Sequence, residues 1–429
     1  MSQPRVQSWE NPRCLIFKEM TKTHPISADT CLFCKGRLFC GKPKCPLLIP
    51  LQKRYSLQNA LKKQTSFFGP TPPDIFIGWK DYPNVWAGPL LIMSEDDPIV
   101  FNSPNEWLTL SLERIAELRT SLLRCYDKIP VKEHVHKLQG DIRDTVLSKN
   151  ALDLEIELKK PPRLQPVFSA IAQPMGPSGS LSQLKIVDNP KIPNKIDSIV
   201  QEDLRASDGL WELYQHGFST YYLQKIFSGG LLGLKRRRKL VPTRWSITAV
   251  DSILAQRLIQ KIKQYPEISD FKVLSNEFAG NHVEVLFLPE HWRYEQLEAW
   301  APGSLWVGQT ANVRIIREEE GYSGRTKYAL REGGGYYAIR FAVLEHLEKI
   351  RRQASVIVFR EVSDEYYLPV GVWECREIIR QAKSINSFNS LKDALEDIQS
   401  RLRIPLSIWK QYSNLLNYHR KQRLLEDYL

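Results

Sequence analysis

The segment Ser355-Val-Ile-Val-Phe-Arg-Glu-Val362 decides the fold class, because this strand pattern comes directly after a helical one. Residues 337–352 predict the helix, and the eight residues that follow are mostly β-branched or aromatic. Residues 283–288 predict a second strand, residues 366–370 a third, and residues 372–382 another helix. Such alternation is typical of proteins in which helices cover a sheet. We therefore predict an α+β fold with a mixed α/β core.

Further helices are expected earlier in the chain. Residues 107–126 carry leucine and isoleucine at helical spacing. Residues 203–227 also look helical, and Ser228-Gly-Gly230 would end that helix. Thr248 is expected to cap a third helix together with Asp251, as in a capping box.

The C-terminal part is predicted to be helical as well. Ser390 and Asp393 are expected to cap a helix over residues 391–402, and Pro405 to open a final one. The chain thus divides into three predicted parts: a small zinc-finger-like unit with four cysteines over residues 1–50, a mixed α/β core with a basic DNA-facing segment over residues 51–385, and a helical C-terminal segment over residues 386–429.

The composition is globular with an excess of positive charge. Sixty Lys and Arg against 48 Asp and Glu give a formal net charge of +12. Because neutralising phosphates releases counterions and adds affinity, this excess favours a polyanion partner over an inert basic surface. No apolar run is long enough for a signal peptide or a bilayer span. The sequence therefore predicts a cytoplasmic protein that makes no membrane contact.

Four of the seven cysteines form a cluster with metal-ligand spacing. They occur in Cys31-Leu-Phe-Cys34-Lys-Gly-Arg-Leu-Phe-Cys40-Gly-Lys-Pro-Lys-Cys45. Two pairs of thiolates can close a tetrahedral site of four sulfur ligands, which structural Zn²⁺ prefers. An iron–sulfur cluster could use the same four ligands and remains the alternative. The sequence predicts one structural zinc site at Cys31, Cys34, Cys40 and Cys45.

A run of five cations, Lys235-Arg-Arg-Arg-Lys239, is followed closely by Arg244 and Trp245. Adjacent cations repel one another unless an anion lies opposite. Guanidinium groups can bind phosphates bidentately, and an indole ring can stack on an unpaired base. A solvated turn or a localisation signal would explain the run equally simply. We favour nucleic-acid binding by Lys235, Arg236, Arg237, Arg238, Lys239, Arg244 and Trp245.

Two further stretches are ambiguous. Residues 321–327 and 331–335 are rich in glycine and precede the helix predicted from Tyr337, so their N–H groups could cradle a phosphate. Their spacing matches no known nucleotide-binding motif, and a plain turn explains them as well. His134 and His136 could bind a metal, although such pairs more often lie on a solvated surface.

The last eight residues, Gln422-Arg-Leu-Leu425-Glu-Asp-Tyr428-Leu429, form a compact docking pattern. In one helical turn Leu425 and Tyr428 point the same way and can enter one apolar site, with Gln422 making hydrogen bonds beside it. The alternative is a helix end that packs on its own core. Because exposing Tyr428 and Leu429 at a terminus is unfavourable for a monomer, the pattern favours a partner.

Together these features resemble the archaeal Nre family of DNA repair proteins. The resemblance covers nearly the whole chain and rests on the four cysteines, Gly69-Pro-Thr-Pro-Pro73, Pro174-Met-Gly-Pro177, residues 235–246, Gly333-Gly-Gly-Tyr-Tyr337 and the tail. It implies repair of DNA damage and binding of the archaeal sliding clamp, the homologue of proliferating cell nuclear antigen (PCNA). The clamp-binding motif maps onto Gln422, Leu425, Tyr428 and Leu429, where Tyr428-Leu429 replaces the double aromatic of the commonest motifs.

Three hypotheses about function follow. The first is a DNA-binding repair factor tethered to the sliding clamp and holding a structural metal. The second is a clamp-recruited nuclease or nucleotide-processing hydrolase, with the glycine-rich segment, Arg244 and Asp251 as candidate catalytic parts. The third is an RNA-binding factor that uses the same basic run. The sequence alone does not decide whether the protein is an enzyme.

Overall fold

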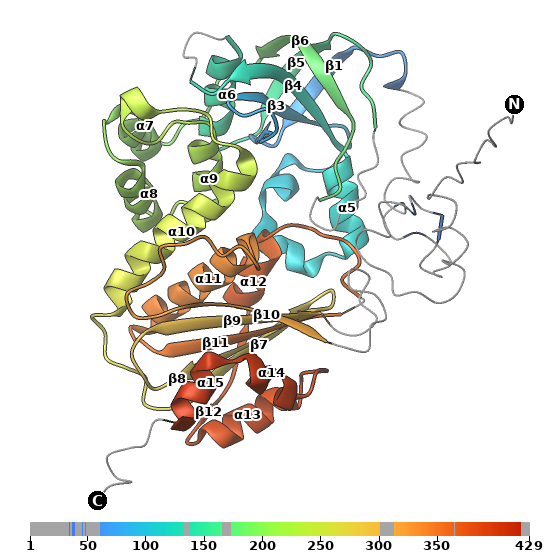
Figure 1. The fold of residues 1–429 in the computed structure, drawn as a ribbon. Helices are drawn as coiled ribbons and strands as arrows, with labels where there is room; N and C mark the ends of the chain where they lie inside the picture. Colours follow the sequence, from blue (N-terminus) through green and yellow to red (C-terminus); the bar gives the residue numbers. More distant parts are fainter. Residues whose placement is uncertain are drawn as a thin grey trace, which may run out of the picture.

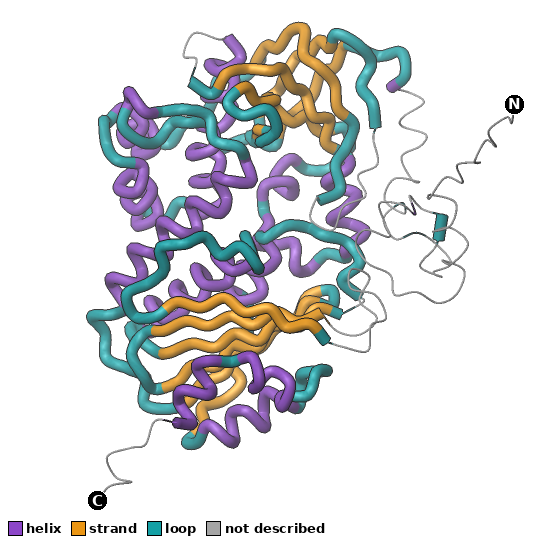
Figure 2. The backbone as a smooth tube through the Cα atoms, in the orientation of Figure 1, coloured by secondary structure: helices purple, strands orange, loops and turns teal. Residues whose placement is uncertain are grey.

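Two six-stranded sheets lie at opposite ends of the computed structural model, and helices fill the space between them (Figure 1, Figure 2). This arrangement confirms the predicted α+β fold. The zinc-finger-like unit and the last eight residues lie outside the described part of the chain, apart from five isolated positions before residue 61. The structure describes residues 61–132, 137–164, 173–300, 313–363 and 365–421, together with Cys34, Arg37, Leu38, Cys45 and Leu48.

The N-terminal sheet has the strand order β1-β5-β6-β4-β3-β2. Only β4 and β6 pair in parallel, and the other neighbours are antiparallel. In β5 alternate residues, from Leu152 to Leu158, are buried, so one face of this strand lies on the core. The strands are β1 (Ser66–Thr71), β2 (Ile75–Ile77), β3 (Asn84–Ile92), β4 (Leu122–Pro130), β5 (Leu152–Leu158) and β6 (Ser178–Ile186).

Short helices surround this sheet and lead from it to the middle of the molecule (Figure 1). They share one continuous apolar core with the C-terminal half. These elements are the 3₁₀ helices η1 (Pro98–Asn102), η2 (Pro104–Thr109) and η3 (Lys235–Arg237), and the α-helices α5 (Leu112–Thr120), α6 (Lys137–Leu147), α7 (Asn194–Gln201), α8 (Ala206–Gln215) and α9 (Thr220–Ser228).

The C-terminal sheet has the strand order β10-β9-β11-β8-β7-β12. Its central strand β11 pairs in parallel with β9 and antiparallel with β8, and all eight of its residues are buried. The strand predicted at residues 355–362 is therefore confirmed, and it lies at the centre of the sheet. The strands are β7 (Phe271–Phe278), β8 (Asn281–Leu288), β9 (Arg293–Trp300), β10 (Arg314–Glu320), β11 (Ser355–Val362) and β12 (Lys383–Phe388).

Three helices cover one face of this sheet: α10 (Thr243–Ile262), α11 (Gly334–Ile350) and α12 (Trp373–Arg380). Gly334 at the start of α11 lies against Thr248 of α10 and Val372 before α12. Near the other end, Tyr265 donates a hydrogen bond of 2.9 Å to Glu348. All three helices therefore begin on the side of the N-terminal sheet, where Thr243 accepts a hydrogen bond from Ile77 N in β2.

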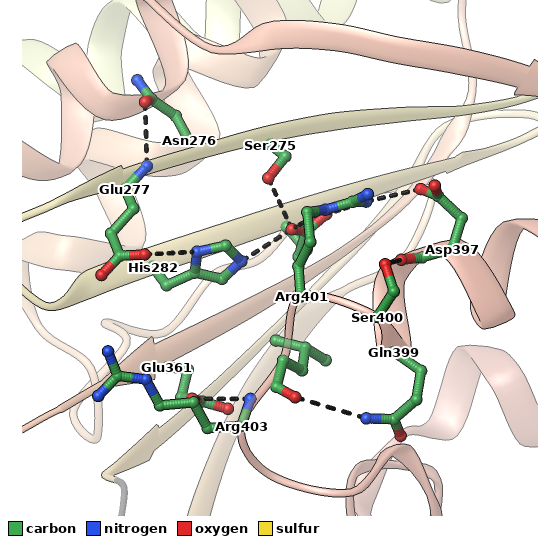
Figure 3. A network of polar contacts seen from close by, with 12 residues as sticks. Ser275, Asn276, Glu277, His282, Glu361, Asp397, Gln399, Ser400, Arg401 and Arg403 are labelled. Atoms are coloured by element: carbon green, nitrogen blue, oxygen red, sulfur yellow. Dashed lines mark hydrogen bonds and ion pairs between the residues drawn. The ribbon is translucent and has the colours of Figure 1, made fainter.

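The opposite face of the sheet carries α13 (Leu391–Gln399), α14 (Leu406–Tyr412) and α15 (Asn414–Lys421) (Figure 1). A polar network fixes these helices to the strands (Figure 3). Its centre is the fully buried carboxylate of Glu284, which accepts hydrogen bonds from Ser275, His282 and Arg401 at 2.6 to 2.8 Å. Arg401 also binds Asp397 of α13 at 2.6 Å, so a single guanidinium joins the strand to the helix.

Several predicted elements need correction. Residues 107–126 form no single helix, because α5 ends at Thr120 and Leu122 begins β4. The helix expected over residues 203–227 is two helices, which Gly217 separates in a left-handed conformation. Residues 366–370 are not a strand. By contrast, Ser390 caps α13 as predicted, accepting a hydrogen bond from Asp393 N at 3.2 Å.

Candidate functional site

The basic run lies on the surface as the short helix η3 and an extended segment after it. Lys235, Arg236, Arg237 and Lys239 are exposed, while Arg238 turns inward. The Arg238 guanidinium donates hydrogen bonds to the carbonyls of Gly233, Val200 and Glu202 at 2.7 to 2.8 Å. Burial lowers the pKa of Arg238, and the neighbouring Arg143 lowers it further. Arg238 thus holds the segment in place, and its four neighbours are left facing solvent.

Arg244 and Trp245 lie in the first turn of α10, beside the exposed cations. This start differs from the prediction, since α10 begins five residues before Thr248, with Pro242 as its N-cap. The first turn holds no acidic residue. A cation there is unfavourable because the helix N-terminus is itself partly positive, and an anion would relieve the repulsion.

Two aromatic residues from the β2–β3 turn complete this surface. Tyr82 lies 5.2 Å from Trp245 between ring centroids, at a tilt of 51°, and its hydroxyl accepts a 2.8 Å hydrogen bond from Lys239. Trp79 belongs to the same turn and is 50% exposed, compared with 45% for Trp245 and 37% for Tyr82. The sequence analysis missed Trp79 and Tyr82, although Trp79-Lys80-Asp81-Tyr82 combines aromatic and charged residues in a turn. We call Trp79, Tyr82, Lys235–Arg237, Lys239, Arg244 and Trp245 the aromatic–basic surface.

The glycine-rich segment forms the tightly packed start of α11. Gly333 has a φ of 58°, which favours glycine. A Cβ at Gly334 would lie 2.8 Å from Val372, and one at Gly335 would lie 3.3 Å from the Arg360 guanidinium. Protein side chains therefore occupy these flanks of the helix start, which favours the plain-turn interpretation over a phosphate cradle.

A buried ionic cluster lies beside this helix start. Arg360 of β11 pairs with Glu298 of β9, and its Nε donates a 2.9 Å hydrogen bond to Asn281. Burial raises the pKa of Glu374 to about 7, although the charge of Arg360 opposes the shift. Glu332 lies near the same pair, and burial followed by the charge of Glu298 raises its pKa well above the usual range. Glu332 is therefore neutral at pH 7.

Asp251, a candidate residue of the enzyme hypothesis, is also buried. It forms an ion pair with Arg376 of α12, and neither side chain is exposed. Gln224 donates a further 3.3 Å hydrogen bond to it. Burial raises the pKa of Asp251, and the charge of Arg376 counteracts this rise. This arrangement joins α9, α10 and α12, so it supports a structural role for Asp251.

The predicted metal ligands fall largely outside the described residues. Cys31, Cys40, His134 and His136 lie there, and Cys34 and Cys45 are the described members of the cysteine set. Within the described part, no group of three or more His, Cys, Asp and Glu side chains is arranged to hold a metal ion. The buried cysteines at 125 and 375 have raised thiol pKa values because of burial. Zinc therefore remains a prediction from the sequence.

Comparison with known families places the chain. Residues 39–307 match the family described as archaeal Nre, N-terminal, and residues 320–428 match archaeal Nre, C-terminal. The chain therefore belongs to the archaeal Nre family, as the resemblance in its sequence indicated. No solved structure gives a significant match.

Individual relatives agree along most of their length. DNA repair protein NreA of Archaeoglobus fulgidus is 39% identical over 87% of this chain and 93% of its own. DNA repair protein NreB of the same organism is 33% identical, over 92% and 99%. NreA of Haloferax volcanii is 34% identical, over 82% and 86%. Among the helices described, none has the length and apolar character that crossing a membrane requires.

Proposed function

We propose that this protein is a DNA repair factor that binds DNA through the aromatic–basic surface and reaches the sliding clamp through its last eight residues. The repair role is supported by the relatives that bear this name. DNA binding is supported by one observation above all, the exposed Tyr82–Trp245 pair with Lys239 and Arg244 around it.

This surface combines the two interactions that single-stranded DNA requires. Its cations can neutralise successive phosphates, and its rings can stack on bases, which contributes about 1–3 kcal/mol per base. The rings of Tyr82 and Trp245 are tilted rather than stacked, so neither face is consumed by the other. Arg238 is excluded from the proposed contact because its guanidinium binds three carbonyls of the protein.

The first experiment measures binding of a fluorescent single strand and of the matching duplex by anisotropy at several salt concentrations. Trp245→Ala is expected to weaken single-strand binding about tenfold. The double variant Arg236→Ala, Arg237→Ala should reduce the salt dependence by roughly 0.7 for each lost phosphate contact.

The matched control is Lys410→Ala with Tyr412→Ala, which removes an exposed cation and an exposed aromatic ring from α14, on the other face of the C-terminal sheet. The control variant should bind as the wild type does. Equal losses in all three variants would contradict a specific role for this surface. A tenfold preference for RNA of the same sequence would favour the RNA-binding hypothesis instead.

The clamp tether is tested by calorimetry with the archaeal clamp. Wild-type protein is expected to bind, and removal of residues 422–429 to abolish the heat of binding. Tyr428→Ala should weaken binding at least tenfold, because buried aromatic anchors dominate such interfaces. Glu426→Ala, in the same segment, is the control and should have little effect. Undiminished binding by the shortened chain would contradict the tether.

We also propose one structural zinc ion at Cys31, Cys34, Cys40 and Cys45. Four thiolates at this spacing suit tetrahedral Zn²⁺. Elemental analysis of purified protein should find one zinc per chain, and Cys34→Ser should reduce that amount. Cys125→Ser, which changes a buried thiol outside the set, should leave the zinc content unchanged. Iron with visible absorption in place of zinc would support the cluster alternative.

A further inference from the structure

Two half-buried cations near the N-terminal sheet form no ion pair with a described carboxylate. They are Arg119, near the end of α5, and Lys225 of α9. Among the described residues neither has an acidic oxygen within 4.0 Å, and the nearest charge acting on both is that of Asp74. Burial lowers the pKa of each cation, and Asp74 only partly opposes this. The site therefore carries two positive charges against one negative charge.

Each cation is nevertheless held in place by uncharged neighbours. The Arg119 guanidinium lies 5.0 Å from the ring centroid of Trp107, and its buried Nε finds no hydrogen-bond partner in the described part of the chain. Lys225 donates to the Asn102 side chain and, at 3.4 Å, to the carbonyl of Pro73. A buried cation without an anion is costly, so this arrangement needs a compensating ligand.

The aromatic support of Arg119 is itself rigid. Trp107 is almost fully buried, and its indole N–H donates a 2.7 Å hydrogen bond to Val100 O. Its ring meets Trp373, the first residue of α12, edge to face at 5.1 Å. The Arg119 guanidinium is therefore preorganised before any ligand arrives, which reduces the entropy lost on binding.

Two proline-rich segments that the proposed function leaves unexplained border this site. Pro73 ends the first and supplies its carbonyl to Lys225. The second, residues 174–177, packs on the turn after Arg119, where a Cβ at Gly176 would lie 2.1 Å from Leu122 O and 2.7 Å from Thr120 O. Only glycine fits there, so this segment fixes the end of α5 and with it the Arg119 side chain.

We propose that Arg119 and Lys225 bind a phosphate monoester. Such a group carries a charge of about −1.5 to −2 at neutral pH, which matches the two cations. Arginine can bind two phosphate oxygens with its planar fork, and lysine adds a point charge. The Asn102 side chain, now held by Lys225, is the uncharged group nearest to the site. The phosphate can come from a DNA terminus or from free phosphate.

The test uses the full-length protein and two titrations followed by calorimetry. The first is inorganic phosphate, against sodium chloride of equal ionic strength. The second is a pair of identical oligonucleotides, one with a 5′-phosphate and one with a 5′-hydroxyl. Wild type is expected to bind phosphate, and a DNA source predicts at least tenfold tighter binding of the phosphorylated strand. If phosphate binds and the two strands bind equally, the ligand is free phosphate.

Variants assign the binding to these side chains. Arg119→Met and Lys225→Met keep the length of the side chain and should each weaken phosphate binding at least tenfold. Arg119→Lys, which keeps the charge but loses the fork, should give an intermediate loss and covers the case in which a methionine variant fails to fold. Arg257→Met, which removes an exposed cation of α10 paired with Asp208, is the control.

Two results would overturn the proposal. One is the absence of phosphate binding to the wild type together with equal binding of both oligonucleotides. The other is undiminished phosphate binding by Arg119→Lys and by both methionine variants. Neither result depends on the aromatic–basic surface, because Trp245→Ala leaves this site intact and reports on the proposed function separately.

Discussion

The two ends of the molecule treat buried charge in opposite ways. Around the C-terminal sheet each deeply buried arginine pairs with an acid, as Arg340 does with Glu320 at 2.5 Å and Arg376 with Asp251. Near the N-terminal sheet Arg119, Arg124 and Lys225 are half-buried, and no ion pair links them to a described carboxylate. A pair formed within the protein serves the fold, whereas a cation left without one is available to a ligand.

The largest expected effect is on the paired end. Arg376→Met leaves Asp251 buried without its cation, which costs about 3–5 kcal/mol. Urea unfolding followed by circular dichroism should show this loss. Adding Asp251→Leu to the same variant should recover a large part of it, because the uncompensated charge is then gone. A loss below about 1 kcal/mol in the single variant would break the comparison.

The network of Figure 3 gives a smaller, pH-dependent effect. Burial lowers the pKa of His282, but Glu284 and Glu277 more than offset this and raise it above 6.5. Burial raises the pKa of Glu284, and its hydrogen bonds from His282 and Arg401 lower it below 4.5 overall. The histidine contribution is thus complete below about pH 6.5 and lost as the pH rises through the folded pKa. The carboxylate contribution is present above 4.5 and lost on acidification.

We therefore expect the free energy of unfolding to fall by on the order of 1 kcal/mol between about pH 6 and pH 8.5 because of His282. The comparison is urea unfolding of wild type and His282→Gln at both pH values. The variant should lose this part of the pH dependence. An identical pH profile in the two proteins would show that His282 contributes nothing through its charge.

At the unpaired end, Arg119→Met and Lys225→Met should change stability by less than about 1 kcal/mol, or should stabilise the protein. Each removes a desolvated cation that no described acid pairs with, while the methionine keeps most of the packing. The same urea titration in phosphate-free buffer measures this. A loss above about 3 kcal/mol would mean that these cations hold the fold together, which would erase the contrast between the two ends.

Glu332 should give the smallest effect, since its raised pKa already makes it neutral at pH 7. Glu332→Gln keeps the shape and changes no charge, so stability at pH 7 should shift by less than about 0.5 kcal/mol. The variant should gain relative stability above the folded pKa of Glu332, where the wild-type carboxyl must ionise in a buried place. Thermal unfolding at about pH 7 and pH 9.5 compares the two proteins.

The C-terminal sheet could be predicted because its strands have simple signals. Residues 355–362 are apolar enough to be recognised alone, and α11 and α12 follow helical patterns. The N-terminal sheet was largely missed. Gly88 and Pro89 interrupt β3, and Gly88 is there because a Cβ would lie 2.0 Å from Cys125 O in the neighbouring strand. A close approach between strands thus looks like a turn in the sequence.

The site was predicted in part for a similar reason. Trp245 and the basic run adjoin one another in the chain, so the sequence indicates them together. Tyr82 reaches them only through the contact between β2 and the start of α10. Arg119 and Lys225 lie on different helices, and each looks like an ordinary surface cation until Asp74 and Trp107 are placed beside them. Long-range packing decides such sites.

The anchoring of α15 sets the reach of the proposed tether. Helix α15 is fixed to the sheet, with His419 binding Glu290 at 2.6 Å and Tyr418 lying 4.2 Å from the Arg293 guanidinium. Only the eight residues after Lys421 can then extend, and their fully stretched length is roughly 30 Å. A molecule held by so short a leash cannot search distant DNA. It can act only on DNA that passes within about one protein diameter of the ring.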